Sequence, residues 1–278
     1  MLSPGEGIKA YSAIGASKAE APAARLFALG VLAGFFVAIA GAATNTAALA
    51  FDAAPAAKLV CALLFPFGLI MVVLTGAELF TGNCLMLISA AEGAARWPGI
   101  LRNLLIVYLG NFAGAVMTAA ACVYSGQMEL GGGALALYTI RLAAAKCSLS
   151  FGKALLLGVL CNILVCTAVI LSVLAKNVPG KAIGAYVPIC LFVLCGFEHC
   201  IANMYFIPAG LMSKGVPAYA ALAAAAGVEL GGLSWPAFLL NNLLPVTLGN
   251  VLGGMGLALL LWFCHGRTMK TETTGAAR

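Results

Sequence analysis

The sequence predicts an all-α membrane protein with six transmembrane helices, arranged as an inverted 3+3 repeat in which the second and fifth helices are broken. Three observations support this fold class: the composition, six long apolar segments and an internal repeat. Hydrophobic residues make up 63% of the 278 residues, and charged residues only 9%. An ordinary soluble domain carries about a quarter charged residues. The composition therefore excludes a soluble domain and indicates a polytopic membrane protein.

Six apolar segments are long enough to cross a bilayer, which needs about 20 residues for a hydrocarbon core of about 30 Å. They span residues 26–50, 58–79, 101–124, 154–175, 183–199 and 239–264. The whole chain is expected to form a single transmembrane domain, 1–278. Within it, 1–25 form a cytoplasmic N-terminal segment, 26–265 the six-span core and 266–278 a polar, disordered cytoplasmic tail. The first 24 residues lack the pattern of a signal peptide, so the first span is expected to anchor the protein.

Two short apolar pieces, 83–91 and 201–212, directly follow the second and fifth segments and are expected to continue them after a break. Each break carries the same pattern, Gly-x-Glu followed by Asn five residues after the Glu. The first copy contains Glu78 and Asn83, and the second contains Glu198 and Asn203. Broken helices are tolerated at membrane depth only where the freed backbone is buried in protein or lines a cavity. The two copies therefore predict two halves of one pore.

The third and sixth spans contain a second repeated stretch. Residues 103–111 read Asn-Leu-Leu-Ile-Val-Tyr-Leu-Gly-Asn, and residues 242–250 read Asn-Leu-Leu-Pro-Val-Thr-Leu-Gly-Asn. Spans one to three thus repeat as spans four to six. Because each repeat has an odd number of spans, the halves are expected to lie in opposite orientations, with a site near the midplane at the broken helices.

The basic residues indicate the orientation, because cytoplasmic loops are enriched in Lys and Arg. Ten of the 15 fall on the side of the termini and five on the other side. Both termini are therefore predicted to be cytoplasmic. This distribution also explains the net charge of +6, so no nucleic-acid partner is implied. The outer connections 125–150 and 214–238 are expected to cap the outer face.

The ten cysteines are interpreted as small buried hydrophobes, because most lie in apolar runs and none forms a Cys-x-x-Cys pair. We therefore expect no metal and no cofactor.

His199 lies beside Glu198 in a segment that is otherwise apolar. An ionisable side chain at membrane depth costs about 2.5 to 3.5 kcal/mol and indicates a functional site. Histidine, with an ordinary pKa of about 6.5, can hold or relay a proton near neutral pH. Glu78 and Glu198 are expected to accept hydrogen bonds from backbone freed at the breaks. Asn162, in the middle of the fourth span, is expected to bond a neighbouring helix or a group at the midplane.

Residues 76–83 (Gly-Ala-Glu-Leu-Phe-Thr-Gly-Asn) and 197–208 (Phe-Glu-His-Cys-Ile-Ala-Asn-Met-Tyr-Phe-Ile-Pro) closely resemble the two signatures of the formate/nitrite transporter family. The resemblance covers about residues 20–265. It implies an aquaporin-like protomer in a homopentamer, with one anion pathway through each protomer, in the plasma (inner) membrane of a bacterium or archaeon. By motif position it implies a periplasmic constriction of Phe65 and Phe192, a cytoplasmic one of Leu69 and Phe80, a central polar site of Thr81, Asn162 and His199, and an outer vestibule lysine, Lys146.

The function expected from this resemblance is transport of a small monovalent anion, with formate first and hydrosulfide, nitrite or lactate as alternatives. In this hypothesis Lys146 draws the anion inward, and the anion meets a proton near His199 and Thr81. It then crosses the apolar slits as a neutral acid. Either His199 or water supplies that proton. A neutral-solute channel is disfavoured because the breaks lack Asn-Pro-Ala. An intramembrane enzyme is disfavoured because no His-Glu-x-x-His spacing is present.

Overall fold

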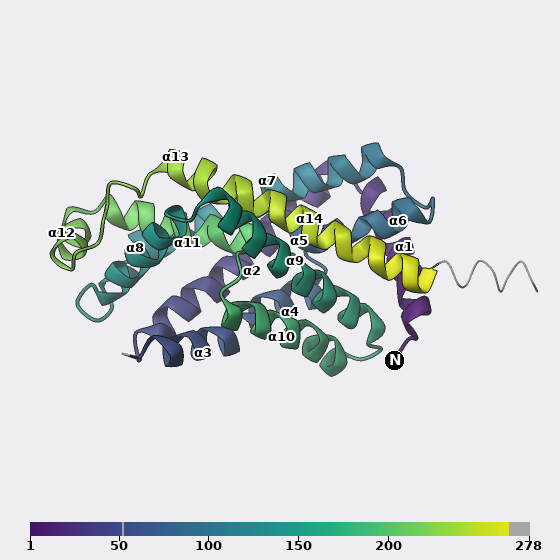
Figure 1. The fold of residues 1–278 in the computed structure, drawn as a ribbon, viewed down its shortest axis with the longest axis horizontal. Coiled ribbons are helices and arrows are strands. Elements are labelled where there is room, and N and C mark those ends of the chain that lie inside the picture. Colours follow the sequence, from purple (N-terminus) through teal and green to yellow (C-terminus); the bar gives the residue numbers. More distant parts are fainter. Residues whose placement is uncertain (52, 267–278) are drawn as a thin grey trace, which may run out of the picture.

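The computed structural model describes residues 1–51 and 53–266. Of the predicted disordered tail, 266–278, Gly266 ends a helical element and the rest lies outside the described residues. The described chain is nearly all helical. Six helical stretches are long and apolar enough to cross a membrane, as the sequence predicted: Ala23–Ala48, Ala54–Thr75, Trp97–Tyr124, Phe151–Leu174, Val178–Cys195 and Trp235–Gly266. Figure 1 shows these helices running roughly side by side along the long axis of the molecule.

The helices that build the spans and the continuation of the fifth span are called the long helices: α2 (Ala23–Ala48), α3 (Ala54–Leu64), α4 (Pro66–Thr75), α7 (Trp97–Tyr124), α9 (Phe151–Leu174), α10 (Val178–Cys195), α11 (Cys200–Lys214) and α14 (Leu244–Leu261). The remaining elements are α1 (Pro4–Glu20), α5 (Phe80–Asn83), η1 (Cys84–Met86), α6 (Leu87–Ala91), η2 (Gln127–Glu129), α8 (Ala134–Cys147), α12 (Pro217–Ala225), α13 (Trp235–Ala237), η3 (Phe238–Leu243) and η4 (Trp262–Gly266).

Two helix pairs, α2 with α7 and α9 with α14, pack through glycines. A Cβ at Gly114 would clash with the carbonyl oxygen of Val31, and one at Gly249 would clash with that of Leu155. Small residues at such positions let membrane helices approach backbone to backbone. The glycines of the third and sixth spans therefore serve helix packing.

The helical ladder of the second and fifth spans is interrupted at corresponding places. Helix α4 ends at Thr75 and α5 begins at Phe80, while α10 ends at Cys195 and α11 begins at Cys200. The residue after each first half is a glycine in the left-handed region, Gly76 with φ 71° and Gly196 with φ 74°. Glycine adopts this conformation without the steric penalty of a Cβ, so it ends a helix abruptly.

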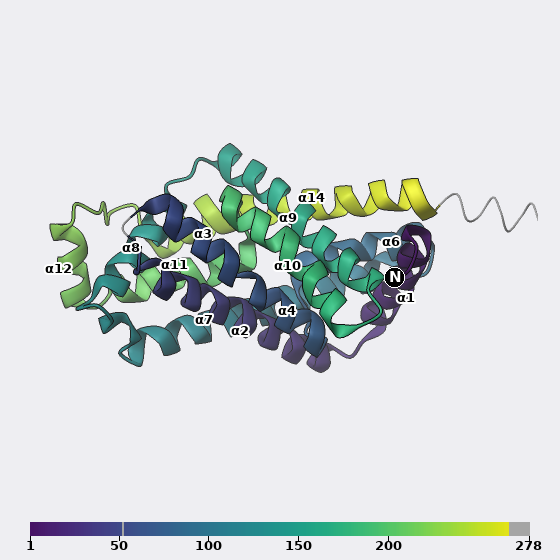
Figure 2. The same ribbon diagram turned by 90° about the horizontal axis from the view of Figure 1, so that it is seen from below.

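Four of the helices outside the six spans lie at two opposite ends of the molecule. Helices α8 and α12 lie at one end in both views, and α1 and α6 lie at the other (Figures 1 and 2). We call these the α8 end and the α1 end. Helix α1 begins at a capping box, in which the Ser3 hydroxyl accepts from the Glu6 amide and the Glu6 carboxylate accepts from the Ser3 amide. These two bonds lower the pKa of the Glu6 carboxyl.

Candidate substrate pathway

The backbone freed at each break is bonded by one asparagine from a neighbouring long helix. At the first break, Asn111 Oδ1 accepts from the Phe80 amide at 2.9 Å, and its Nδ2 donates to the Glu78 carbonyl at 2.8 Å. At the second break, Asn250 Oδ1 accepts from the Cys200 amide at 2.9 Å, and its Nδ2 donates to the Glu198 carbonyl at 3.0 Å. Buried backbone groups are costly unless they are hydrogen-bonded. These two asparagines therefore allow the breaks to be buried.

The carboxylates of the two motifs accept hydrogen bonds from side chains, whereas the sequence predicted bonds from freed backbone amides. Glu198 accepts from Lys146 Nζ at 2.8 Å and from Asn203 Nδ2 at 2.6 Å. Glu78 accepts from Lys18 Nζ at 3.1 Å and from its own motif asparagine, Asn83, at 2.6 Å. Both carboxylates are buried. Each break thus holds a lysine–glutamate ion pair.

A second asparagine closes each network. Asn103 accepts from Asn83 at 2.8 Å and donates to the Lys18 carbonyl at 3.1 Å. At the other break, Asn242 accepts from Asn203 at 2.7 Å and donates to the Lys146 carbonyl at 3.0 Å. The two networks share these connections.

The networks differ at two places. Asn242 Nδ2 makes a further bond to Glu198 Oε2, at 3.4 Å, that has no counterpart at the first break among the described residues. Lys18 Nζ also donates to Asn83 Oδ1, at 2.7 Å. The corresponding atom, Asn203 Oδ1, is buried and has no hydrogen-bond partner among the described residues. Since the Asn203 amide nitrogen already donates to Glu198 and Asn242, the orientation of this amide is fixed. An acceptor is therefore left open at the second break alone.

Two separate cavities lead toward the breaks. The α1-end cavity, about 420 Å³, is lined by one motif with α1, α4, α9 and α10. The α8-end cavity, about 480 Å³, is lined by the other motif with α2, α3, α8, α9, α10 and α11. They share no lining residue, and each exposes the corresponding positions of its motif. Those positions are Gly76, Ala77, Glu78, Leu79, Gly82 and Asn83 in the first and Gly196, Phe197, Glu198, His199, Ala202 and Asn203 in the second.

His199 and Thr81 meet between the two breaks. His199 is the N-cap of α11, and its Nδ1 accepts from the Ala202 amide at 3.1 Å. Its Nε2 lies 3.0 Å from Thr81 Oγ1. Because Nδ1 accepts a bond, the neutral ring carries its proton on Nε2 and donates toward Thr81. Asn162 lies next to them and donates to the carbonyls of Thr81 and Asn250, at 3.2 and 2.6 Å. The three predicted central residues are thus adjacent.

Apolar side chains lie on both sides of this centre. At the α8 end the rings of Phe65 and Phe192 meet edge to face, with centroids 5.8 Å apart, and the Phe192 ring stacks on His199. Leu69 lines the α1-end cavity together with Leu79. The Phe80 ring is buried edge to face against Tyr108, with centroids 4.7 Å apart.

The cysteines only partly match their interpretation as buried residues. Five are buried, whereas Cys195 and Cys264 are exposed. In the described part of the chain, no group of three or more potential ligands is arranged to hold a metal ion.

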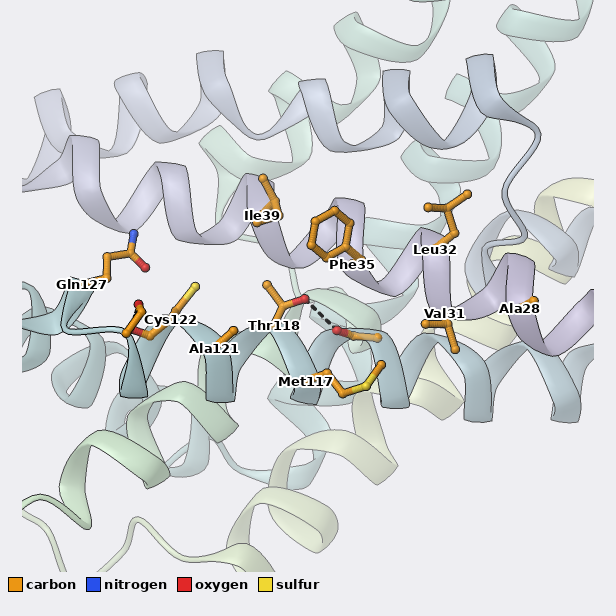
Figure 3. A pocket seen from close by; sticks show the side chains of 12 residues that line it. Ala28, Val31, Leu32, Phe35, Ile39, Met117, Thr118, Ala121, Cys122 and Gln127 are labelled. Atoms are coloured by element: carbon orange, nitrogen blue, oxygen red, sulfur yellow. Dashed lines mark hydrogen bonds between the residues drawn. The ribbon is translucent and has the colours of Figure 1, made fainter.

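A third hollow is unrelated to the breaks. It is an apolar groove of about 760 Å³ between α2 and α7, with Phe35 and Ile39 on one wall and Met117 and Cys122 on the other (Figure 3). It shares no lining residue with either cavity.

Sequence reasoning missed the second lysine and the four asparagines of the break networks: Lys18, Asn103, Asn111, Asn242 and Asn250. The signal was present for the asparagines, because they begin and end the repeated nine-residue stretch. Lys18 carried no such signal, since it lies in the polar N-terminal segment.

A helical membrane bundle with cavities from opposite ends and an apolar barrier between them is the architecture of a channel or transporter. The sequence profile of the formate/nitrite transporter family matches residues 5–264. The chain belongs to this family and is a transport protein rather than an enzyme.

Similar proteins agree with this assignment. The formate channel FocA of Haemophilus influenzae is 39% identical over 82% of each chain. A probable formate transporter of Methanothermobacter thermautotrophicus is 37% identical over 95% of this chain and 97% of its own. A solved structure of a pentameric formate channel with formate bound has a TM-score of 0.79 at 36% identity, covering 87% of this chain and 96% of that one.

Proposed function

We propose that this protein carries formate across the plasma membrane of a bacterium or archaeon, together with a proton. The observation that carries the proposal is the pair of opposed cavities, each ending at an ion-paired break, with apolar side chains between them. In the proposed orientation both termini are cytoplasmic, so the α1-end cavity faces the cytoplasm. The exposed leucines and phenylalanines of the long helices face lipid or neighbouring protomers. The pentameric relative supports a homopentamer with one path in each protomer.

The energetics favour passage as the neutral acid. Protonating a small carboxylate with a pKa of about 4 at pH 7 costs about 4 kcal/mol. Carrying the bare anion into an apolar slit costs several kcal/mol at least, and about 20 kcal/mol in the idealised limit. Protonating the anion therefore costs less free energy than moving the bare anion into the slit. We propose that Phe65 and Phe192 form one slit and that Leu69, Leu79 and Phe80 form the other.

We propose water, rather than His199, as the proton source. The His199 ring holds one proton, on Nε2, and giving it up would leave an imidazolate. Taking up a second proton on Nδ1 would break the bond from the Ala202 amide and leave that buried N–H without a partner. His199 then acts as a hydrogen-bond donor that orients the substrate beside Thr81 and Asn162. The open acceptor of Asn203, on the wall of the α8-end cavity, suits the O–H of a water or of the newly formed acid.

Flux measurements on proteoliposomes test this function. Formate uptake down its gradient should carry a proton, seen as acidification of the lumen by an entrapped pH dye. Formate uptake without proton movement would overturn the proposal. The same assay with hydrosulfide, nitrite and lactate tests the alternatives, because the described lining contains no group specific for a carboxylate. A channel faster for hydrosulfide or nitrite than for formate would replace formate as the proposed substrate.

A further inference from the structure

Each cavity has a second lysine in its lining that the break networks do not use. Lys58 of α3 lines the α8-end cavity, and Lys181 of α10 lines the α1-end cavity. Each lies near the start of a broken span, shortly after a proline, Pro55 or Pro179. The inverted repeat thus supplies one such lysine to each mouth.

The lysines inside the networks carry a compensated charge. Lys146 lies 2.8 Å from Glu198, and Lys18 lies 3.1 Å from Glu78. An ion pair viewed from several ångströms away acts as a dipole, so its field falls off faster than that of a single charge. Neither paired lysine is therefore a strong source of long-range attraction for an anion.

Lys58 and Lys181 carry the net charge of the two linings. Among the described residues, each lining contains two lysines and one glutamate. After the ion pair is cancelled, one positive charge remains on each lining, and it belongs to the second lysine. Among the described residues, neither Lys58 nor Lys181 has a carboxylate within 4 Å.

The placement of these lysines suits capture at the mouth. Lys58 is exposed, and its Nζ lies over Gly196, the glycine that begins the second break. Lys181 is half-buried beside Ser172, whose hydroxyl donates to the Lys181 carbonyl at 3.0 Å. Both lysines line the cavity that an anion would cross to reach the buried pair.

We propose that Lys58 and Lys181 are the anion-capture charges of this transporter, one for each direction of transport. This inference rests on the proposed function, because it assigns the first step of the same path. Capture and protonation then take place at different positions. The unpaired lysine concentrates the anion at the mouth, and the paired lysine is part of the cavity wall next to the slit.

The test is the salt dependence of formate uptake in membrane vesicles of both orientations. The Debye length is about 30 Å at 0.01 M salt and about 3 Å at 1 M, so capture by an exposed charge should act only at low salt. K58Q should lower the initial rate about two- to fivefold at low salt from the α8 end, with no effect at high salt. K181Q should do the same from the α1 end. K58R and K181R, which keep the charge, should behave like the wild type.

Lys153 and Lys176 supply matched controls, because both are exposed and line neither cavity. K153Q and K176Q should leave the salt dependence unchanged. A wild-type protein that moves no formate would contradict the proposed function itself. If the wild type moved formate at a rate independent of salt, only the capture proposal would be overturned. The same would follow if K58Q and K181Q showed the same salt dependence as the controls K153Q and K176Q.

Discussion

The ion pair between Lys146 and Glu198 gives the sharpest prediction about the pathway. Its Nζ and Oε1 atoms are 2.8 Å apart, with side chains that are 14% and 8% exposed. Removing one partner of such a buried pair leaves an uncompensated charge and costs about 3 to 5 kcal/mol of stability. K146Q and E198Q should each lower the thermal unfolding temperature of the purified protein. In K146Q/E198Q both charges are gone and two amides remain, so most of that loss should be recovered.

Transport by the two single variants should change in opposite ways. K146Q leaves a carboxylate on the cavity wall, which repels an anion by about 4 kcal/mol at 4 Å if the effective dielectric constant is about 20. Its KM for formate should rise. E198Q leaves an unpaired ammonium that holds the anion, so both KM and the maximal rate should fall. These changes should persist at high salt, because a largely buried charge is screened weakly.

The assays are a double-mutant cycle on unfolding and formate flux from the α8 end, with K153Q as the exposed control. Strict additivity of the two stability losses would refute the reasoning, since it would mean that the charges do not interact. If KM changed in the same direction in K146Q and E198Q, this would contradict the inference that Glu198 compensates the charge of Lys146.

The remaining predictions concern the centre, the slit and the break. H199N should fold, because asparagine is a good N-cap, and formate flux should keep its wild-type pH profile; a folded variant that loses this profile would restore His199 as the proton donor. F192A should raise the leak of small ions, measured as conductance, because it shortens an apolar barrier, whereas F35A in the apolar groove between α2 and α7 should not. Equal leak in both variants would mean that Phe192 does not line the path. N250L loses three buried side-chain hydrogen bonds, so it should lower the free energy of unfolding by about 3 kcal/mol or more. The exposed cap variant N177A should lower it by only about 1 kcal/mol. Thermal unfolding measures both, and a stability loss in N250L no larger than that in N177A would contradict the role of Asn250.

The class of the protein and the number of its spans can be predicted from the sequence alone. Long apolar segments can satisfy their backbone in a bilayer only as helices or closed barrels, so composition and segment length are enough to predict six helices. The two motif copies also located the centre of the pathway, because an ionisable residue such as Glu198 or His199 is costly at membrane depth and therefore indicates a functional site. The structure brings His199, Thr81 and Asn162 together there.

Only the tertiary structure decided which partners the polar residues have. The motif showed two glutamates, but their lysines come from distant segments, Lys18 of α1 and Lys146 of α8. No local periodicity encodes such a pairing, because it depends on where separate helices meet. The same reason hid the role of Asn111 and Asn250, whose repetition was visible while their bonds to the breaks were not.

The compensation of the Lys146 charge can be seen in the tertiary structure but not in the sequence. From the sequence, Lys146 is a basic residue at a vestibule and is expected to attract anions. In the fold its charge is paired with Glu198, and among the described residues of that cavity the unpaired charge belongs to Lys58. A list of charges fixes their sum, whereas the field that an anion meets depends on the distances between them. Those distances exist only once the helices are packed.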